Sequence, residues 1–266
     1  MRRSVLISTC STVVILGGLV AVLVTSPGWH TVRETFFSWS AFRQSFGQVL
    51  GGFWLDVRMF LIVEVVVLVL GLLIALCRTI QMAALFPLRL LAIVYVDVLR
   101  GVPTILFVYL VGFGVPALAL TGLPTGAVFL GGAALAMCYS AYVSEVFRAG
   151  IESIHPSQAG AALALGLTPA QAMRHVVLPQ AVRRVLPPLL NDFISLQKDV
   201  ALVSILGPQE AFRVAQIFAA SQFNYTPLIA AALLYLCVTI PLTRIVDRLQ
   251  LRSVRERGAA LALGPR

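Results

Sequence analysis

Residues 58–76 read RMFLIVEVVVLVLGLLIAL, an apolar run bounded by Arg58 and Arg78 whose interior holds one charged side chain, Glu64. Nineteen residues of α-helix rise about 28 Å, close to the thickness of the hydrocarbon core of a bilayer. The stretch therefore predicts a helix that crosses a membrane, and it makes lipid the solvent in which the rest of the chain has to be understood.

The remainder of the chain has the same apolar character. Of its 266 residues 59% are hydrophobic and 12% are charged, and the mean hydropathy is +0.93. This composition excludes a water-soluble enzyme and a disordered chain as leading interpretations. Further runs long enough to cross a bilayer lie at 5–24, 90–118, 125–146, 187–206 and 227–245. We therefore expect an all-α integral membrane protein with about six transmembrane helices, the first being too long for the apolar part of a secretory signal.

The arginines predict the orientation of these spans. The net charge is +9, and Lys198 is the only lysine among 20 cationic residues. Fourteen arginines fall on one side of the predicted spans: Arg2, Arg3, Arg78, Arg89, Arg148, Arg174, Arg183, Arg184, Arg244, Arg248, Arg252, Arg255, Arg257 and Arg266. Four fall on the other: Arg33, Arg43, Arg58 and Arg213. By the positive-inside rule both termini are cytoplasmic, and the basic charge requires no nucleic-acid partner.

Two segments are expected to depart from simple spans. Residues 25–55 carry Trp29, Trp39 and Trp54 and lie on the outer side, where they form either an ordinary loop or a docking surface. The run 90–118 is too long for one straight span and contains Arg100-Gly101-Val102-Pro103. Because proline lacks a backbone donor and disfavours helix in the residue before it, we expect a broken or kinked helix there.

The cytoplasmic insert at 148–186 carries the most specific pattern. Residues 157–165 favour a helix, and Gly166 stands where a left-handed residue would end it. A second helix is expected to begin at the capping box of Thr168 and Gln171 and to close at Leu178-Pro179. Alanines and Gly160 give the first helix a face that another backbone can approach closely. The pattern predicts a short helix–turn–helix that inserts into a partner.

These residues resemble a known family. Ala161-Ala162, Gly166, nine further residues and Val176-x-Leu178-Pro179 are similar to the cytoplasmic loop motif of the membrane subunits of bacterial ATP-binding-cassette (ABC) importers. The flanks resemble the branch that takes up polar amino acids: Arg100-Gly101-x-Pro103, Ala164-Leu165-Gly166-Leu167, Leu178-Pro179-Gln180-Ala181, Leu186-Pro187-Pro188-Leu189, and Lys198-Asp199 before Leu202-Val203-Ser204. The resemblance covers about residues 52–249.

The resemblance implies a permease subunit in the bacterial plasma membrane that imports a polar amino acid. It implies a five-helix type I importer core at 54–249. Outside that core, the residues themselves predict an N-terminal anchor helix and outer-face aromatic segment at 1–53 and a basic cytoplasmic tail at 250–266. Its partners would be a second permease subunit, two ABC ATPase subunits, an extracytoplasmic amino-acid-binding protein and membrane lipid. The ATPase contact would be made by Gly160, Ala161, Ala162, Gly166, Leu178 and Pro179.

The chain departs from the family pattern at Gly160, where the family has a glutamate, and in its extra first span. It also has no Walker A loop, since the only lysine, Lys198, is followed by Asp199. ATP and magnesium are therefore expected on the partner, and this chain is expected to be no enzyme and to bind no cofactor or metal.

Ionisable side chains inside the spans are the candidates for a translocation path, because a bilayer penalises them. They are Glu64, Asp97, Asp192, Lys198 and Asp199. Asp97 has a simpler explanation, an ion pair with Arg100 three residues on, which we weigh above substrate contact. Glu145 is expected to pair with Arg148 in the same way. Structural and path roles stay open for Lys198 and Asp199, whereas Glu64 is expected to be either a path residue or a partner for the other subunit.

A passive or mechanosensitive channel is the alternative function, although a channel needs no large cytoplasmic helix–turn–helix. A membrane enzyme is disfavoured because His30, His155 and His175 are scattered outside the spans. The sequence does not identify the amino acid that is carried or decide between a homodimer and a heterodimer.

Overall fold

The structure, a computed structural model, describes the backbone of residues 2–79 and 82–262 and the side chains of residues 9–79 and 82–250. The anchor and tail side chains at 2–8 and 251–266, including Arg2, Arg3 and Arg252, lie outside the described side chains.

Every element in this described part is helical. In chain order they are α1 (Arg2–Val24), α2 (Trp29–Phe36), α3 (Trp39–Thr79), η1 (Ala83–Leu85), α4 (Phe86–Gly101), α5 (Thr104–Ala117), α6 (Ala127–Glu152), α7 (Pro156–Ala164), α8 (Pro169–Ala172), η2 (Met173–Val177), α9 (Leu178–Asp199), η3 (Val200–Leu206), α10 (Ala211–Gln222) and α11 (Thr226–Ala262). The expected all-α class is confirmed.

Three described helices, α3, α6 and α11, are long and apolar enough to cross a membrane. Helices α4 and α5 make a fourth span if the bent pair is counted as one, and residues 9–24 of α1 form a shorter apolar helix. The expected span at 187–206 is not among these candidates, because the segment is divided between the charged helix α9, which ends at Asp199, and the 3-10 helix η3. The fold therefore has several apolar spanning helices. Among the described residues they number three, or four with the bent pair, where six were expected.

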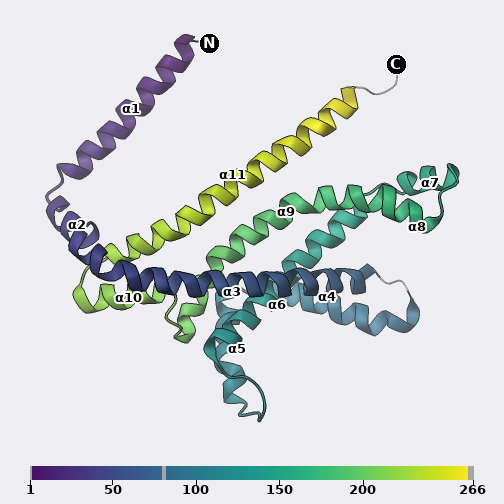
Figure 1. Ribbon diagram of the computed structural model, residues 1–266, viewed down its shortest axis with the longest axis horizontal. Helices are drawn as coiled ribbons and strands as arrows, with labels where there is room; N and C mark the ends of the chain where they lie inside the picture. Colours follow the sequence, from purple (N-terminus) through teal and green to yellow (C-terminus); the bar gives the residue numbers. More distant parts are fainter. Residues whose placement is uncertain (1, 80–81, 263–266) are drawn as a thin grey trace.

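The helices are arranged around α3, which runs the length of the bundle (Figure 1). Helices α2 and α10 lie at its N-terminal end, whereas α7 and α8 lie at the opposite end of the molecule. Helix α5 leaves the bundle sideways, and α1 stands apart from it. The bend between α4 and α5 is 109°, at Gly101-Val102-Pro103, so the predicted break is confirmed.

The main core lies where α3 packs against α6, η3 and the inner side of α9. Its buried members on α3 follow helical spacing, with Met59, Val63 and Val67 on one face. They meet Leu135 and other apolar residues of α6. Gly71 permits the close approach, because a Cβ there would lie 2.7 Å from Val143 Cγ1. Small residues at helix crossings are the usual means of tight packing between spanning helices.

A second, smaller core joins the first half of α3 to α10 and α11. Val49 and Phe53 of α3 pack there against Ala211, Ala215 and Ala231. The aromatic segment at 25–55 is mostly helical, and hydrogen bonds from Tyr225 and Asn224 attach α2 to the α10–α11 connection. Among these, the Tyr225 amide donates to the Thr35 carbonyl at 2.6 Å. This end of the molecule is therefore an ordered assembly of α2, α10 and the start of α11.

The helix–turn–helix at 156–177, here called the α7–α8 hairpin, forms largely as expected. Gly166 has φ +87°, and Thr168 and Gln171 make the reciprocal capping box. The expected end at Leu178-Pro179 is wrong. The chain passes from α8 through the π-helical turn η2 directly into α9, with Pro179 in the first turn of α9, a position that proline tolerates.

Candidate functional site

A polar cavity lies beside the bend of α4 and α5, between α5, α6 and α9. Its volume is about 330 Å³, which falls in the range of small-molecule sites. It is lined by Thr104, Tyr139, Tyr142, Asp192, Ser195, Lys198 and Asp199. A concentration of acidic, basic and hydroxyl groups inside an apolar bundle marks a candidate site for a polar molecule.

Two carboxyl groups of the cavity differ in their hydrogen bonding. The Tyr139 hydroxyl donates to Asp199 Oδ2 at 2.8 Å, which fixes that carboxylate against α6. Asp192 Oδ2, by contrast, is buried and has no hydrogen-bond partner among the described residues. Because a buried acceptor without a donor is costly, this oxygen is the natural acceptor for a donor group on a bound molecule.

Charges just outside the lining act on the same carboxylate. Arg100, at the bend, and Glu64, on α3, both interact electrostatically with Asp192. The Arg100 guanidinium carbon also lies 5.8 Å from the centre of the Tyr142 ring, within cation–π range. Arg100 thus lies beside the cavity, with its positive charge near both an acidic and an aromatic lining residue.

The structure brings together most of the sequence-predicted path residues. Asp192, Lys198 and Asp199 line one cavity, and Glu64 is coupled to it through Asp192. Asp97 is on an exposed face of α4 and does not line it. The expected ion pair of Asp97 with Arg100 is wrong. Arg100 instead lies 3.8 Å from Glu145, because the bend turns the end of α4 toward α6.

Sequence reasoning missed Thr104, Tyr139, Tyr142 and Ser195. A signal was present, since Asp192, Ser195 and Asp199 recur at spacings of three and four residues and so share one face of a helix. Tyr139 and Tyr142 share a face of α6 for the same reason. Which helix faces which could not be read from spacing alone.

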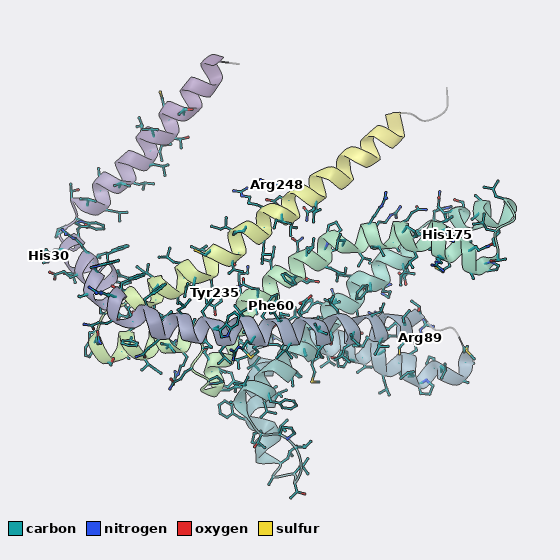
Figure 2. The ribbon with its side chains drawn as sticks, viewed as in Figure 1. His30, Phe60, Arg89, His175, Tyr235 and Arg248 are labelled. Atoms are coloured by element: carbon teal, nitrogen blue, oxygen red, sulfur yellow. The ribbon has the colours of Figure 1, made fainter. Side chains whose placement is uncertain are left out.

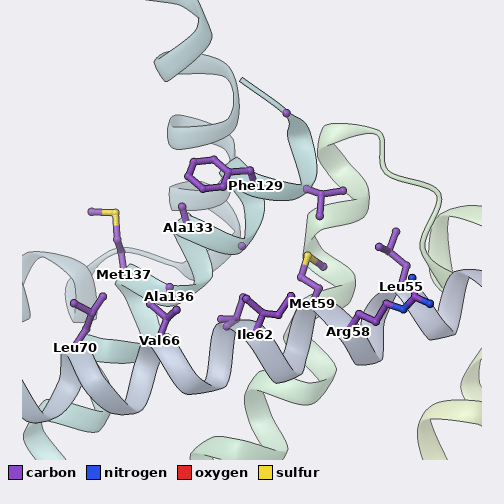
Figure 3. Close-up of a pocket in the computed structure, with 14 residues that line it drawn as sticks. Leu55, Arg58, Met59, Ile62, Val66, Leu70, Phe129, Ala133, Ala136 and Met137 are labelled. Carbon is purple, nitrogen blue, oxygen red and sulfur yellow. The ribbon is translucent and has the colours of Figure 1, made fainter. Parts of the chain in front are cut away.

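A larger cavity of about 800 Å³ lies between α3 and α6 (Figure 3). Most of the residues that Figure 3 labels are apolar, including Ile62, Val66 and Phe129, and Arg58 is the one charged residue among the described residues that line it. Arg58 could bind a carboxylate, but this lining has no acidic side chain for a positively charged group, so the smaller cavity of mixed charge is the better candidate for a polar ligand.

Glu145 is the centre of an ion-pair cluster where α3, α4 and α6 meet. Arg78 Nη1 lies 2.5 Å from Glu145 Oε2, and Arg148 pairs with the same carboxylate, as the sequence predicted. Arg148 also pairs with Glu152. The cluster ties the end of α3 and the bend after α4 to α6.

The α7–α8 hairpin exposes most of the small residues that the sequence singled out. Gly160, Ala161 and Gly166 are exposed, and a Cβ on Gly160 would meet nothing within 4 Å. Ala162 is different, because it is 4% exposed and packs inside the segment. Leu178 and Pro179 are exposed at the start of α9. The hairpin therefore presents small residues outward while Ala162 supports it from within.

The histidines do not assemble a metal site. His30 and His175 lie at opposite ends of the molecule (Figure 2), and His155 caps α7, its ring nitrogen accepting from the Ser157 amide at 3.2 Å. Over the described residues, no group of three or more histidine, cysteine or acidic side chains is arranged to hold a metal ion.

One protein family matches most of the chain. Residues 68–255 match the family described as "Binding-protein-dependent transport system inner membrane component". The arginine transport system permease protein ArtQ of Bacillus subtilis (strain 168) is 33% identical over 196 residues, covering 73% of this chain and 87% of that protein. The probable glutamine ABC transporter permease protein GlnM of the same organism is 36% identical over 169 residues, covering 62% and 76%.

Solved structures share the fold. A chain from a crystal structure described as an amino acid ABC transporter with histidines has a TM-score of 0.72 and 31% identity, covering 81% of this chain and 98% of that one. A chain of the methionine ABC transporter MetNI, in an inward-facing conformation, has a TM-score of 0.59 and 18% identity, covering 77% and 95%. The second likeness shows the fold alone.

Proposed function

Because the chain belongs to the family of binding-protein-dependent transport system inner membrane components, as a permease subunit of an ABC amino-acid importer, we propose that its polar cavity is part of the path along which the amino acid crosses. The chain is a multi-pass inner membrane protein within an ABC transporter complex, and the ATPase is a separate subunit.

The single observation that carries this proposal is the unpartnered Asp192 Oδ2 in a cavity of mixed charge. A free amino acid presents an ammonium group and a carboxylate. Asp192 is an acceptor for the ammonium group, whereas Lys198 and Arg100 supply positive charge for the carboxylate. The relatives named for arginine and glutamine support a polar amino acid as substrate.

Energy is proposed to enter through the α7–α8 hairpin. Its exposed Gly160, Ala161 and Gly166 allow a partner backbone to approach closely, and Leu178 and Pro179 extend this surface along α9. Ala162 contributes by packing within the hairpin rather than by direct contact. The proposed partner of this surface is an ABC ATPase subunit.

The other subunits of the complex are also inferred from the family to which the chain belongs. We infer a second permease subunit, homologous or identical, two ATPase subunits, and an extracytoplasmic binding protein that delivers the amino acid. Both termini are proposed to be cytoplasmic. Support comes from Arg78, Arg89, Arg148 and Arg174, which belong to the end of the molecule that carries the α7–α8 hairpin, while Arg43 and Arg213 belong to the other.

Reconstitution tests the function directly. The chain, with its ATPase and binding protein in proteoliposomes, should accumulate labelled arginine, glutamine or histidine only when ATP is present. Asp192→Asn should raise the substrate concentration for half-maximal uptake, because the ammonium group loses a charged acceptor. Conduction by the isolated chain without ATP would instead support the channel alternative.

A further inference from the structure

A second buried polar cluster joins α3 to the start of α10, at the end of the bundle opposite the α7–α8 hairpin (Figure 1). Asp56 of α3 is 2% exposed and Glu210, which caps α10, is 0% exposed. Tyr235, which Figure 2 labels on α11, donates its hydroxyl hydrogen to Asp56 Oδ2 at 2.8 Å. Three elements thus converge on two carboxyl groups that the transport path does not use.

One carboxylate oxygen of this cluster has no hydrogen-bond partner among the described residues. Glu210 accepts from the amides of Phe212 and Arg213, at 2.6 and 2.7 Å. Asp56 Oδ2 accepts from the Tyr235 hydroxyl and, at 3.3 Å, from the Ala211 amide. Asp56 Oδ1 is buried and has no partner among the described residues. The two carboxyl groups interact directly with each other.

No described cation compensates for this pair. Arg58, two residues beyond Asp56, lies with its guanidinium carbon 5.3 Å from the centre of the Trp54 ring. Arg213 of α10 is exposed and contributes only its backbone amide. Tyr235 is the titratable group that α11 brings to the pair, and η3 carries none. Two adjacent carboxylates in an apolar setting cannot both stay charged without a large free-energy cost.

Close packing of α3 against the start of α10 holds the two carboxyl groups together. Gly52 lies one helical turn before Asp56, and a Cβ there would lie 2.6 Å from the Glu210 carbonyl carbon. The backbones of α3 and of the start of α10 are therefore in direct contact. Phe53 packs edge-on against the Tyr235 ring at 5.3 Å and closes the apolar wall.

We propose that Asp56 and Glu210 share one proton, held between Asp56 Oδ1 and the Glu210 carboxyl group, and that this proton fastens α10 to α3. The shared proton gives the unmatched oxygen a partner and reduces the charge of the pair from two to one. Its loss puts two negative charges side by side and loosens the start of α10. Burial first, and the charge of Asp56 second, raise the pKa of Glu210, which agrees with proton retention.

The raised pKa of Glu210 sets the direction in which the contact between α3 and α10 responds to pH. A carboxyl group with a raised pKa stabilises the folded contact while it is protonated, and the stabilisation is lost as the pH rises. The inference concerns contacts within this chain and does not depend on which amino acid is carried. It makes the attachment of α10 sensitive to proton concentration on the side of the membrane opposite the α7–α8 hairpin.

Hydrogen exchange tests the inference on the full complex in nanodiscs. The amides of residues 211–214 are followed between about pH 5 and about pH 9, with rates corrected for intrinsic exchange. In the wild type their protection should fall as the pH rises, by up to about tenfold per pH unit over the range in which the closed contact still holds the proton and the opened segment has released it. Asp56→Asn should abolish this dependence. The side-chain amide of the asparagine donates a hydrogen bond to a charged Glu210 carboxylate, and the amide itself cannot titrate.

Glu34→Gln is the matched control. Glu34 is an exposed carboxyl group on α2 at the same end of the molecule, so its removal should leave the pH dependence of residues 211–214 unchanged. Glu210→Gln is the second variant, and it should also remove the dependence, which keeps the test informative if Asp56→Asn fails to fold.

Infrared spectroscopy gives a readout that a purely structural role would not move. The wild type should show the C=O band of a protonated carboxyl group that disappears at high pH, and either variant should lack it. Protection that is independent of pH in the wild type, or a pH dependence that survives in both variants, would overturn the inference.

Discussion

The Tyr139 hydroxyl donates a hydrogen bond of 2.8 Å to Asp199 Oδ2, joining α6 to the last turn of α9 across the polar cavity. The bond holds one acidic side chain of the cavity in a fixed orientation, while no described residue donates a hydrogen bond to Asp192 Oδ2.

Removing this hydrogen bond should weaken substrate binding. Tyr139→Phe deletes a donor to a carboxylate, an interaction that contributes about 1.5–3 kcal/mol. Asp199 then reorients, and we expect the KM for uptake to rise by about tenfold or more. Uptake kinetics in proteoliposomes measure it. Tyr142→Phe, which keeps the ring near Arg100 and removes a hydroxyl for which no hydrogen bond is described, should have the smaller effect; the reverse order would contradict the assignment.

The ion-pair cluster around Glu145 should matter for stability. Glu145→Gln leaves Arg78 and Arg148 without their shared carboxylate and should lower the free energy of unfolding by about 1.5–3 kcal/mol. Glu152→Gln is the matched control, because that side chain is 54% exposed and its ion pair with Arg148 should contribute at most about 1 kcal/mol. Thermal unfolding in nanodiscs compares them, and equal losses would contradict a central role for Glu145.

The crossing of α3 and α6 should tolerate no added side chain at Gly71. Gly71→Ala puts a Cβ 2.7 Å from Val143 Cγ1, and overpacking of this kind costs about 1–3 kcal/mol. Val143→Ala should rescue it in the double variant, since the clashing methyl group is removed. Gly132→Ala provides the comparison, because its Cβ would lie at an ordinary 3.4 Å from Val63. Unfolding midpoints of the four proteins decide the matter.

The two glycines of the α7–α8 hairpin should respond oppositely to alanine. Gly166 has φ +87°, so Gly166→Ala should destabilise the turn by about 1–2 kcal/mol. Gly160 lies in open space within α7, so Gly160→Ala should stabilise that helix by up to about 1 kcal/mol. Hydrogen exchange over residues 156–177 measures both effects.

ATPase-subunit affinity in detergent then tests the proposed contact at Gly160. If the partner keeps a cation for the family glutamate, Gly160→Glu should bind more tightly. Strong loss with Gly160→Glu alone would indicate a changed partner surface. Strong loss with Gly160→Ala would mean that the contact tolerates no side chain and requires backbone approach.

The proposed orientation can be tested by labelling in intact cells. In a background without Cys10, Cys77, Cys138 and Cys237, Ser40→Cys should react with a membrane-impermeant thiol reagent and Ala170→Cys should not. Both positions are exposed, so accessibility from the two sides of the membrane is the variable measured. Reaction of Ala170→Cys alone would reverse the topology.

The sequence was sufficient for the helical class, the break at Pro103 and the capped hairpin, because each depends on local chemistry. Hydrophobic run length, the missing proline donor and the Thr168–Gln171 capping box act within a few residues. The end of the second hairpin helix was wrong for a related reason. Pro179 is compatible with the first turn of a helix as well as with a helix end, and only packing decides between them.

The pairing of charges could not be predicted from spacing. Arg100 has Asp97 three residues away, yet the bend directs it toward Glu145 on another helix. The neighbours Asp56 and Glu210 are separated by more than half the chain, and no local pattern connects them. Long-range contacts of this kind depend on how the helices cross, and helix crossings depend on small residues such as Gly52 and Gly71.

The break between α4 and α5 has a consequence for hydration. The first amides of α5, from Thr104 onward, have no partner within the helix, and no side chain in the described part of the protein caps them. Hydrocarbon offers nothing to satisfy such groups, so a broken helix at membrane depth is tolerated only beside protein or water. Thr104 lines the polar cavity, so we expect water to fill that cavity before substrate arrives. Along the proposed path, an amino acid would have to displace that water from those amides, and we expect this exchange to contribute to the barrier to transport.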